Sequence, residues 1–484
     1  MLPLCASRGG TRVTGRHAAG GAVISSTRMA RWLQSLVVRV LGRSEFFLAG
    51  TFAALILIGA ILLRLPAAHA RTTVGFLDAL FTSTSAVCVT GLAVVDTGRD
   101  YSRFGQAVIM LLIQFGGLGI LTFTAIGTQF MGLRMSFRQQ ALLADSFFQS
   151  HSASQIRVDL KRIVGMTLLI ELVGAVLIYL DLRDAPEGHS SLFSAAFHSI
   201  SAFCNAGFSL YADNLVAYRS RLLFLFTIMA LIVFGGLGHS VTLEMARRAV
   251  DRLRRRHDGP VQWSLHSRVV LRVTALLIIG GALGILVFGL TADEGRWGEK
   301  VVNALFQSIT ARTAGFNSVN IGALPLASLL VLIVLMFIGG SPCSCAGGIK
   351  TTSAATWLAM LRARLNGRRD VSLLGRRLPD EVIARAVMVV SLAVLWHTVG
   401  CIILALTELP AGTMKLQDIL FEQTSAFGTV GLSTGITPHL SPMGKVWIIA
   451  SMFVGRVGPL TAALAVLPIR STEVRYTEER LMIG

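Results

Sequence analysis

The chain has 484 residues, of which 53% are hydrophobic and only 14% are charged, against about 25% charged residues in a typical soluble domain. Its 44 Lys and Arg residues outnumber its 26 Asp and Glu residues and give a net charge of +18, which in a soluble protein would suggest a nucleic-acid partner. The composition argues instead against a soluble globular protein and predicts an integral membrane protein with basic cytoplasmic loops.

Eight apolar stretches are predicted to cross the membrane as helices, because about 20 apolar residues cover the roughly 30 Å of hydrocarbon in a bilayer. In chain order these stretches cover residues 46–63, 107–131, 163–180, 222–241, 271–290, 327–340, 382–406 and 446–469. Between the two members of each consecutive pair lies a segment of about ten residues, which is too short to cross as a helix. We expect these short segments to be re-entrant.

The four short segments are copies of one another and form an internal repeat. They read FTSTSAVCVTGL, FHSISAFCNAGF, FQSITARTAGF and FEQTSAFGTVGL, ending at Leu92, Phe208, Phe316 and Leu432. The glycines before these ends recur at spacings of 116, 108 and 116 residues, at Gly91, Gly207, Gly315 and Gly431. The third copy has one residue fewer between its Thr310 and its glycine, so the end of its short helix must be built differently.

The predicted fold is an all-α membrane protein of four tandem units in a pseudo-fourfold arrangement. Each unit is a span, a re-entrant pore helix and a second span, which gives eight transmembrane helices and four pore helices. The pore repeats are predicted at 46–132, 158–246, 269–362 and 382–470, between a basic, disordered N-terminal tail at 1–45 and a C-terminal tail at 471–484. Met29 is an alternative start to Met1.

The basic residues predict the orientation of these spans. The two tails and the connectors over 133–162, 245–272 and 350–385 carry 31 of the 44 Lys and Arg residues. Since cytoplasmic loops are enriched in Lys and Arg, both termini are predicted to be cytoplasmic, and the short segments to dip in from outside. The charge then needs no nucleic acid, and the basic connectors are expected to touch anionic membrane lipid.

Four glycine-ended loops at membrane depth predict a cation filter. Non-helical backbone is tolerated there only where it is buried in protein or lines a water-filled cavity. If the loops converge, their carbonyl oxygens can replace the hydration shell of a monovalent cation, as in potassium channels. The negative C-terminal ends of the short helices would favour a cation on the same axis. Glycines that only pack helices together would explain one copy rather than four.

A second set of glycines lies in the span after each short segment. The four strings are Gly116-Gly117-Leu118-Gly119, Gly235-Gly236-Leu237-Gly238, Gly339-Gly340-Ser341-Pro342 and Gly455-Arg456-Val457-Gly458. Close packing of helices around the pore, without a ligand role, is the better interpretation of the GGLG strings.

Taken together, these features resemble the Trk/Ktr/HKT superfamily of potassium transporters. The resemblance rests on the fourfold plan, the filter strings VTG, NAG, TAG and TVG, the interrupted span GGSPCSCAGGIKTT and the string GRVGPLT, over residues 46–470. It is greatest to the membrane subunit of bacterial Ktr systems, because the N-terminal tail has no apolar run for the two extra spans of Trk relatives. It implies potassium uptake and no enzymatic activity; the alternative is a sodium or mixed monovalent-cation transporter of the same fold.

The resemblance also implies roles for individual residues. The filter would coordinate K⁺, the only expected metal, through the backbone carbonyls of Val89, Thr90, Gly91, Asn205, Ala206, Gly207, Thr313, Ala314, Gly315, Thr429, Val430 and Gly431. Sodium-preferring members often have serine where this chain has Gly91, so glycine there favours potassium. The gate would be the loop of Gly339, Gly340, Ser341, Pro342, Cys343, Ser344, Cys345, Ala346, Gly347 and Gly348. Such a run cannot hold a stable helix, since glycine costs about 1 kcal/mol and proline about 3 kcal/mol per position.

Among the polar residues within the predicted spans, Arg456 is the one for which we predict a functional role. A buried guanidinium in mid-span is costly. The resemblance implies that it lies in the pore near the gate loop and either imposes an electrostatic barrier or holds loop carbonyls; an ion pair with a carboxylate such as Glu171 or Glu244 is the alternative. The residues His198, His239 and His397 are predicted to be hydrogen-bonded core side chains. A metal site or enzyme nucleophile at Cys343 and Cys345 has little support, because the spacing supplies no His or carboxylate partner.

The expected partners also follow from the resemblance. It implies a homodimer in the bacterial cytoplasmic (inner) membrane, beneath which a separate cytosolic ring of nucleotide-binding subunits docks. The chain carries no nucleotide-binding fingerprint, so ATP or ADP is expected on that partner only, and no covalently bound cofactor is expected.

Overall fold

The computed structural model describes residues 44–71, 73–119, 153–184, 191–253, 263–289, 296–412 and 414–466. The described residues from Leu48 onward form one compact unit. The predicted C-terminal tail, nearly all of the predicted N-terminal tail and residues 120–152, with most of the first connector, lie outside the described residues.

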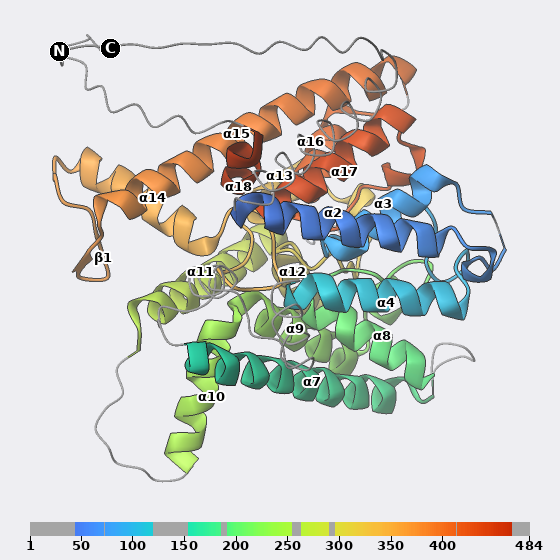
Figure 1. The fold of residues 1–484 in the computed structure, drawn as a ribbon, viewed down its shortest axis with the longest axis horizontal. Coiled ribbons are helices and arrows are strands. Elements are labelled where there is room, and N and C mark those ends of the chain that lie inside the picture. The colour runs from blue at the N-terminus through green and yellow to red at the C-terminus, as the bar shows by residue number, and fades with distance from the viewer. Residues whose placement is uncertain are drawn as a thin grey trace, which may run out of the picture. The chain divides into compact units, whose positions relative to one another are not determined.

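Nearly all regular structure in the described part of the chain is helical, so the predicted all-α class is confirmed (Figure 1). Four helices precede the short segments: α2 (Ser44–Leu63), α7 (Ala153–Leu182), α11 (Leu265–Phe288) and α15 (Asp380–Glu408). The short segments begin with α3 (Phe76–Val87), α8 (Leu192–Phe203), α12 (Trp297–Thr310) and α16 (Leu416–Gly428). The helices that follow are α4 (Arg103–Leu118), α9 (Leu222–Leu237), α13 (Leu326–Phe337) and α17 (Pro442–Val457).

The remaining elements lie outside these three sets of helices. They are the helices α10 (His239–Leu253), α14 (Thr351–Leu365) and α18 (Pro459–Val466), and the 3₁₀ turns η1 (Pro66–Ala68), η2 (Val216–Tyr218), η4 (Ile321–Ala323), η5 (Leu409–Ala411) and η6 (Thr437–His439). The strands β1 (Ser372–Leu373) and β2 (Arg376–Arg377) form an antiparallel hairpin. The sequence did not predict α10, α14 or this hairpin in the basic connectors.

Three helices in the described residues are long and apolar enough to cross a membrane, over Lys161–Leu182, Leu265–Phe288 and Asp380–Glu408. A fourth is added if α9 and α10 are counted as one span that bends by 108°. The other predicted spans contain shorter helices. Two predicted spans are interrupted at glycines with positive φ, Gly238 (+88°) and Gly458 (+98°), because this conformation cannot continue a right-handed helix.

The helices around the short segments pack in a closed ring. Each helix that follows a short segment contacts the short helix of the neighbouring unit: α4 packs on α8, α9 on α12, α13 on α16, and α17 on α3. The helices before the short segments pack outside this ring, with α7, α11 and α15 against α8, α12 and α16.

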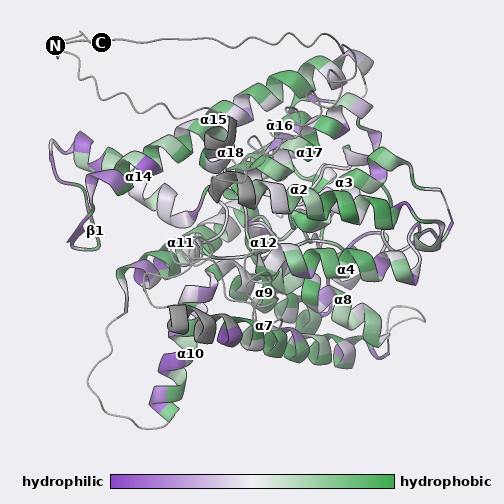
Figure 2. Cartoon of the chain, viewed as in Figure 1, coloured by the Kyte–Doolittle hydropathy of each residue, from purple (hydrophilic) through white to green (hydrophobic). Residues whose placement is uncertain are grey.

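The outer faces of these helices are apolar (Figure 2). Large hydrophobic side chains are exposed there, such as Leu172 on α7, Leu276 on α11 and Leu395 on α15. Contiguous exposed apolar surface of this kind suits a protein surrounded by lipid.

Candidate functional site

The four repeated glycines form a closed ring in chain order. A Cβ atom added to Gly91 would lie 3.1 Å from the Cα of Gly207, and one added to Gly207 would lie 2.8 Å from the Cα of Gly315. A Cβ atom added to Gly315 would lie 3.1 Å from the Cα of Gly431, and one added to Gly431 would lie 3.0 Å from the Cα of Gly91. Residues up to 340 positions apart in sequence therefore meet backbone to backbone, with no room for a side chain.

The backbone repeats the same conformation in each quarter of the ring. All four glycines have positive φ, and so does the residue two positions earlier: Val89 (56°), Asn205 (60°), Thr313 (73°) and Thr429 (50°). A non-glycine residue in this region is uncommon. Four of them at equivalent places indicate that the surrounding fold imposes this conformation, and residues of this kind cluster at functional sites.

The hydrogen bonds of these segments fix the direction of their peptide groups. The amides of Thr90, Ala206 and Val430 donate to a serine carbonyl near the end of the preceding short helix, at 2.8, 2.7 and 2.8 Å. Since N–H and C=O point in opposite directions in a trans peptide, the carbonyls of the preceding residues point away from the short helices. In the third unit, which is one residue shorter, Ala314 N–H donates to Thr310 at 2.9 Å, four residues back rather than five.

Three threonines of these segments have unpaired hydroxyl groups. The Oγ1 atoms of Thr90, Thr313 and Thr429 are buried and have no hydrogen-bond partner within the described part of the chain. Buried polar atoms normally have a partner, so a set of unpaired oxygens beside a ring of backbone carbonyls fits a place where ions or water are held.

Serines anchor three of the short helices to the helices outside them. The hydroxyls of Ser83, Ser199 and Ser308 donate to backbone carbonyls of α2, α7 and α11 at 2.7, 2.6 and 2.7 Å. Glycines on those helices provide the space, since a Cβ at Gly59, Gly174 or Gly281 would overlap the serine. In the fourth unit the side chain of Gln423 lies against Gly400 in the same manner. Each anchoring side chain stands third in its repeated string, so these contacts explain why a polar residue recurs at that position.

The second set of glycines packs helices, as the sequence predicts. A Cβ at Gly116, Gly235 or Gly455 would overlap the backbone carbonyl of Val87, Phe203 or Phe427, which lie at or next to the C-terminal ends of α3, α8 and α16. The helices α4, α9 and α17, which follow the short helices and are called inner helices below together with α13, therefore approach their own short helices as closely as two backbones can.

The third unit has a loop where the others have this packed helix. It runs from Ile338 to Lys350 between α13 and α14, and a parallel bridge between Ile338 and Ile349 closes it. Its amides donate to the ends of two neighbouring helices: Ser341 to Gly236 at 3.1 Å and Gly348 to Gly455 at 3.3 Å.

The same loop touches the glycine-ring segments. A Cβ at Gly347 would lie 3.0 Å from the Cβ of Thr429, and one at Gly339 would lie 3.3 Å from the Cγ2 of Thr313. The loop therefore packs directly against residues of the third and fourth ring segments. On its other side Cys343 accepts a hydrogen bond from the His239 amide at 2.9 Å.

Arg456 binds this loop rather than a carboxylate. Its guanidinium donates to the carbonyl of Cys345 and to the carbonyl of Gly116. Within the described residues it forms no ion pair with Glu171 or Glu244, which accept hydrogen bonds from Gln114 and Arg248 at 3.1 Å. The ion-pair alternative for Arg456 is therefore wrong in this structure.

The histidines are buried to different degrees. His198 is fully buried and contacts Ser209 Oγ at 3.0 Å, as expected of a hydrogen-bonded core residue. His239 is also buried. His397 is only partly buried and contacts the sulfur of Cys401 at 3.6 Å.

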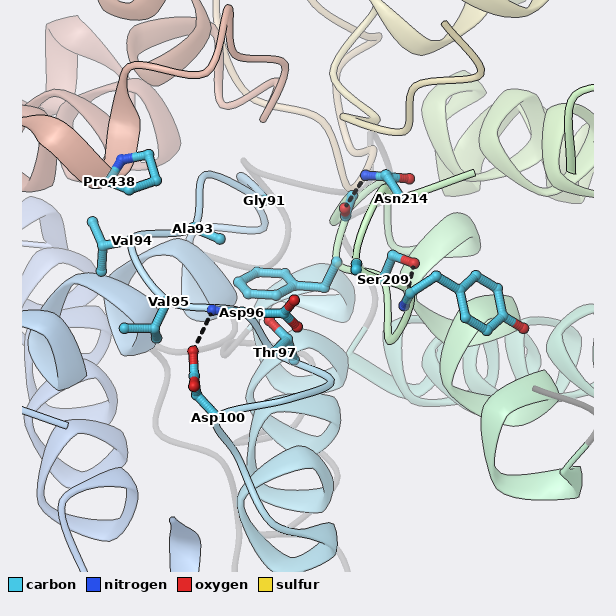
Figure 3. A pocket seen from close by; sticks show the side chains of 14 residues that line it. Gly91, Ala93, Val94, Val95, Asp96, Thr97, Asp100, Ser209, Asn214 and Pro438 are labelled. Carbon is cyan, nitrogen blue, oxygen red and sulfur yellow. Dashed lines mark hydrogen bonds between the residues drawn. The ribbon is translucent and has the colours of Figure 1, made fainter. Parts of the chain in front are cut away.

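Sequence reasoning missed two features beside the ring. One is a hollow of about 450 Å³ lined by Gly91, Gly207, Asp96 and Asp100 among others (Figure 3). The Asp100 carboxylate accepts from the Asp96 amide at 2.9 Å. The position of Asp96 and Asp100, five and nine residues after Gly91, is a signal that could have found them. The other is Arg312, the one Lys or Arg in the four repeated strings.

Comparison with known proteins agrees with this geometry. The family profile described as "TrkH: Cation transport protein" matches residues 45–472. The chain is 34% identical over 445 residues to the potassium/sodium uptake protein NtpJ of Enterococcus hirae, which covers 90% of this chain and 96% of that protein. It is 35% identical over 467 residues to the Ktr system potassium uptake protein B of Bacillus subtilis, covering 95% of this chain and 100% of that protein.

The fold is also that of a known structure. The crystal structure of the potassium transporter TrkH from Vibrio parahaemolyticus superposes with a TM-score of 0.65 and 19% sequence identity, covering 92% of this chain and 96% of that one.

Proposed function

This chain belongs to the TrkH family of cation transport proteins, and from that premise we propose that it takes up potassium ions across the cytoplasmic membrane. As a member of this family it is a membrane-integral transporter and not an enzyme. Potassium is part of the names of its Ktr-system relatives from Bacillus subtilis and Vibrio alginolyticus, which are 35% and 36% identical to it.

The proposed filter is the four-glycine ring, with Val89, Thr90, Gly91 and their equivalents as the ion-coordinating segments. The single observation that carries this assignment is the ring itself, in which four segments share one backbone conformation and meet at their glycines. A dehydrated monovalent cation needs several oxygens at equal distances, and equivalent segments around one axis supply them. Glycine at all four positions leaves the opening unobstructed by side chains.

Four repeats of span, pore helix and span would place this filter in the membrane, with the short helices entering from outside. The closed contacts between each inner helix and the next short helix support that plan. The distribution of Lys and Arg supports cytoplasmic termini. Potassium would then enter at the hollow lined by Asp96 and Asp100 and leave toward the cytoplasm.

The proposed gate is the loop from Gly339 to Gly348. Its contacts with Thr313 and Thr429 put it next to the filter segments, and an ion that left the filter would meet it. Arg456 would hold the loop closed through the Cys345 carbonyl and would also repel a cation at this point. Opening requires that the loop move aside.

Control by a partner is part of the proposal. The names of the Ktr-system relatives imply a further subunit in those systems, and a cytosolic ring that binds ATP or ADP would act on this chain from the cytoplasmic side. We propose a homodimer of the chain as the membrane component, with α10, α14 and the β1–β2 hairpin as candidate docking elements.

A sodium or mixed-cation transporter is the second candidate. It is favoured by the name of the Enterococcus relative, which includes both potassium and sodium. Uptake of rubidium and of sodium into proteoliposomes that contain the purified chain would separate the two, since a potassium filter accepts rubidium and rejects sodium.

Growth at low external potassium tests the filter assignment. Cells without potassium uptake systems should grow when they produce the wild-type chain, and should not when they produce Gly431→Ser, because a Cβ there overlaps the Thr90 carbonyl. Gly435→Ser is the matched control: Gly435 also has positive φ, at 100°, but nothing lies within 4 Å of its Cβ position. Full growth with Gly431→Ser present in the membrane would refute the filter.

A further inference from the structure

The C-terminal end of the third short helix carries a positive charge that the other three lack. Helix α12 ends at Thr310, its cap is Ala311, and the next residue is Arg312. The caps of α3, α8 and α16 are Cys88, Cys204 and Thr429. Because the C-terminal end of a helix carries partial negative charge, a guanidinium beside it offsets the field that would otherwise attract a cation. The third short helix is therefore the weakest cation attractor of the four.

Arg312 is buried with little compensation. It is 7% exposed, and its one hydrogen bond in the described part of the chain runs from Nη2 to the carbonyl of Gly339, at 3.3 Å. Its Nε is buried without a partner. The surrounding side chains are mostly apolar and come from α9, α11 and α12: Ile232, Val233, Thr274, Ile278 and Ile309. A buried cation without a carboxylate is unfavourable, so its retention needs an explanation other than stability.

The acceptor of that hydrogen bond supplies the explanation. Gly339 is the first glycine of the loop between α13 and α14, and its Cβ position is also in contact with the side chain of Thr313, the neighbour of Arg312. At the far side of the loop Arg456 donates to the carbonyl of Cys345. Two arginines from different repeats, Arg312 buried and Arg456 partly buried, thus hold the loop at Gly339 and at Cys345.

We propose that Arg312 is a positioning residue that latches the beginning of the gate loop to the third pore helix. The inference rests on the proposed function, in which this loop is the gate. Arg312 acts on the loop through the Gly339 carbonyl and does not touch the permeating ion. When the loop opens, this hydrogen bond breaks and leaves the buried guanidinium without its acceptor, so the bond favours the closed loop.

Two readouts on Arg312→Gln test the latch. In proteoliposomes without any partner subunit, rubidium-86 uptake should rise on the order of tenfold, the shift expected when a hydrogen bond to a charged group no longer favours the closed state. The fully buried Cys345 should become reactive toward N-ethylmaleimide, measured for its own peptide by mass spectrometry. The ratio of rubidium to sodium uptake should stay at the wild-type value, because a latch does not alter the filter.

The control is Arg221→Gln, since Arg221 also donates to a backbone carbonyl, that of Asp181, but lies at the start of α9, far along the chain from the loop. It should leave uptake and Cys345 labelling unchanged. If Arg312→Gln cannot be purified, Arg312→Lys, which keeps the charge but has fewer donors, should give a smaller change in the same direction.

The outcomes separate the latch from the proposed function. Wild-type uptake and wild-type protection of Cys345 in both Arg312 variants would overturn the latch, and so would a changed rubidium-to-sodium ratio, which would place Arg312 in the filter. Failure of both the wild-type chain and the Arg312 variants to transport rubidium would overturn the proposed function. The labelling of Cys345 would still report whether Arg312 holds the loop.

Discussion

The inner helices α4, α9 and α17 each have 16 residues and stop at a glycine with positive φ, whereas α13 has 12 residues and runs into a non-helical loop. At the glycine ring, by contrast, all four units share one backbone signature. A set of oxygens around an ion has to be equivalent from every side. A gate needs only one element that moves while its neighbours stay in place. The molecule therefore combines fourfold repetition at the ring with a single exception beneath it.

The exception is visible in what the inner glycines face. In units one, two and four they face the carbonyl of a short helix, so the inner helix is locked to a rigid neighbour. In the third unit Gly339 faces the carbonyl of Gly347, a residue of the loop itself. The third unit has thus exchanged a contact between two helices for a contact within one loop.

The largest effect should come from filling one of the packing contacts. Gly235→Val places a branched side chain on the Phe203 carbonyl, and overpacking of this kind destabilises by about 1–3 kcal/mol or more. We expect loss of most monodisperse protein in detergent and a lower midpoint of thermal unfolding. Gly280→Val on α11 is the control, because nothing lies within 4 Å of its Cβ position.

The equivalent change in the third unit sharpens the comparison. Gly339→Val overlaps the Gly347 carbonyl of the loop and otherwise meets the methyl group of Thr313. Because the loop yields more readily than a packed helix, more folded protein should remain than for Gly235→Val. Equal losses for the two variants would show that the third unit is as rigid at Gly339 as the second unit is at Gly235.

An intermediate effect is expected from substituting Arg456, a residue of the fourth unit that binds the loop of the third unit. Arg456→Gln removes the hydrogen bonds to Cys345 and Gly116 as well as the positive charge. Rubidium uptake into proteoliposomes should rise on the order of tenfold, since a lost charge-assisted hydrogen bond shifts an equilibrium by about that factor. Arg456→Lys keeps the charge and should lie between. An unchanged rate and voltage dependence in Arg456→Gln would remove it from the gate.

Much of this contrast could be predicted from the sequence because repetition is itself evidence. Four copies of one string, and a glycine at the same place in each, predicted segments that the structure brings together at Gly91, Gly207, Gly315 and Gly431. The Gly-Gly-Ser-Pro run predicted the interruption of α13 because glycine and proline are poor helix formers. The roles assigned to these residues as filter and gate stay predictions until flux is measured.

The parts that could not be predicted depend on contacts between distant residues. The resemblance allowed Arg456 to hold loop carbonyls, but nothing in the string around it identifies those of Cys345 and Gly116, since a carbonyl leaves no trace in the sequence. The helix interruptions at Gly238 and Gly458 require positive φ, which glycine permits but does not dictate. The helices α10 and α14 lie largely in the basic connectors, whose Lys and Arg residues predict the orientation of the spans but not helical structure.

The smallest effect concerns a further difference between the units, in the acidic residues that line the hollow beside the glycine ring. Only the first unit has carboxylates five and nine residues after its ring glycine, at Asp96 and Asp100, and both line the hollow beside Gly91. Asp100→Asn keeps an oxygen for the Asp96 amide but removes one negative charge. We expect the rubidium concentration for half-maximal uptake to rise by about twofold at low ionic strength, because carboxylates concentrate cations at an entrance.

Ionic strength distinguishes this effect from a distorted filter. The difference between Asp100→Asn and the wild type should shrink when choline chloride raises the ionic strength, because the Debye length falls from about 30 Å at 0.01 M to about 10 Å at 0.1 M salt. Asp184→Asn, at an exposed carboxylate beside Arg183 beyond the end of α7, removes the same charge away from the hollow and should change little. A defect in Asp100→Asn that persists at high salt would mean that Asp100 supports the first ring segment mechanically, and the asymmetry of the entrance would then be structural rather than electrostatic.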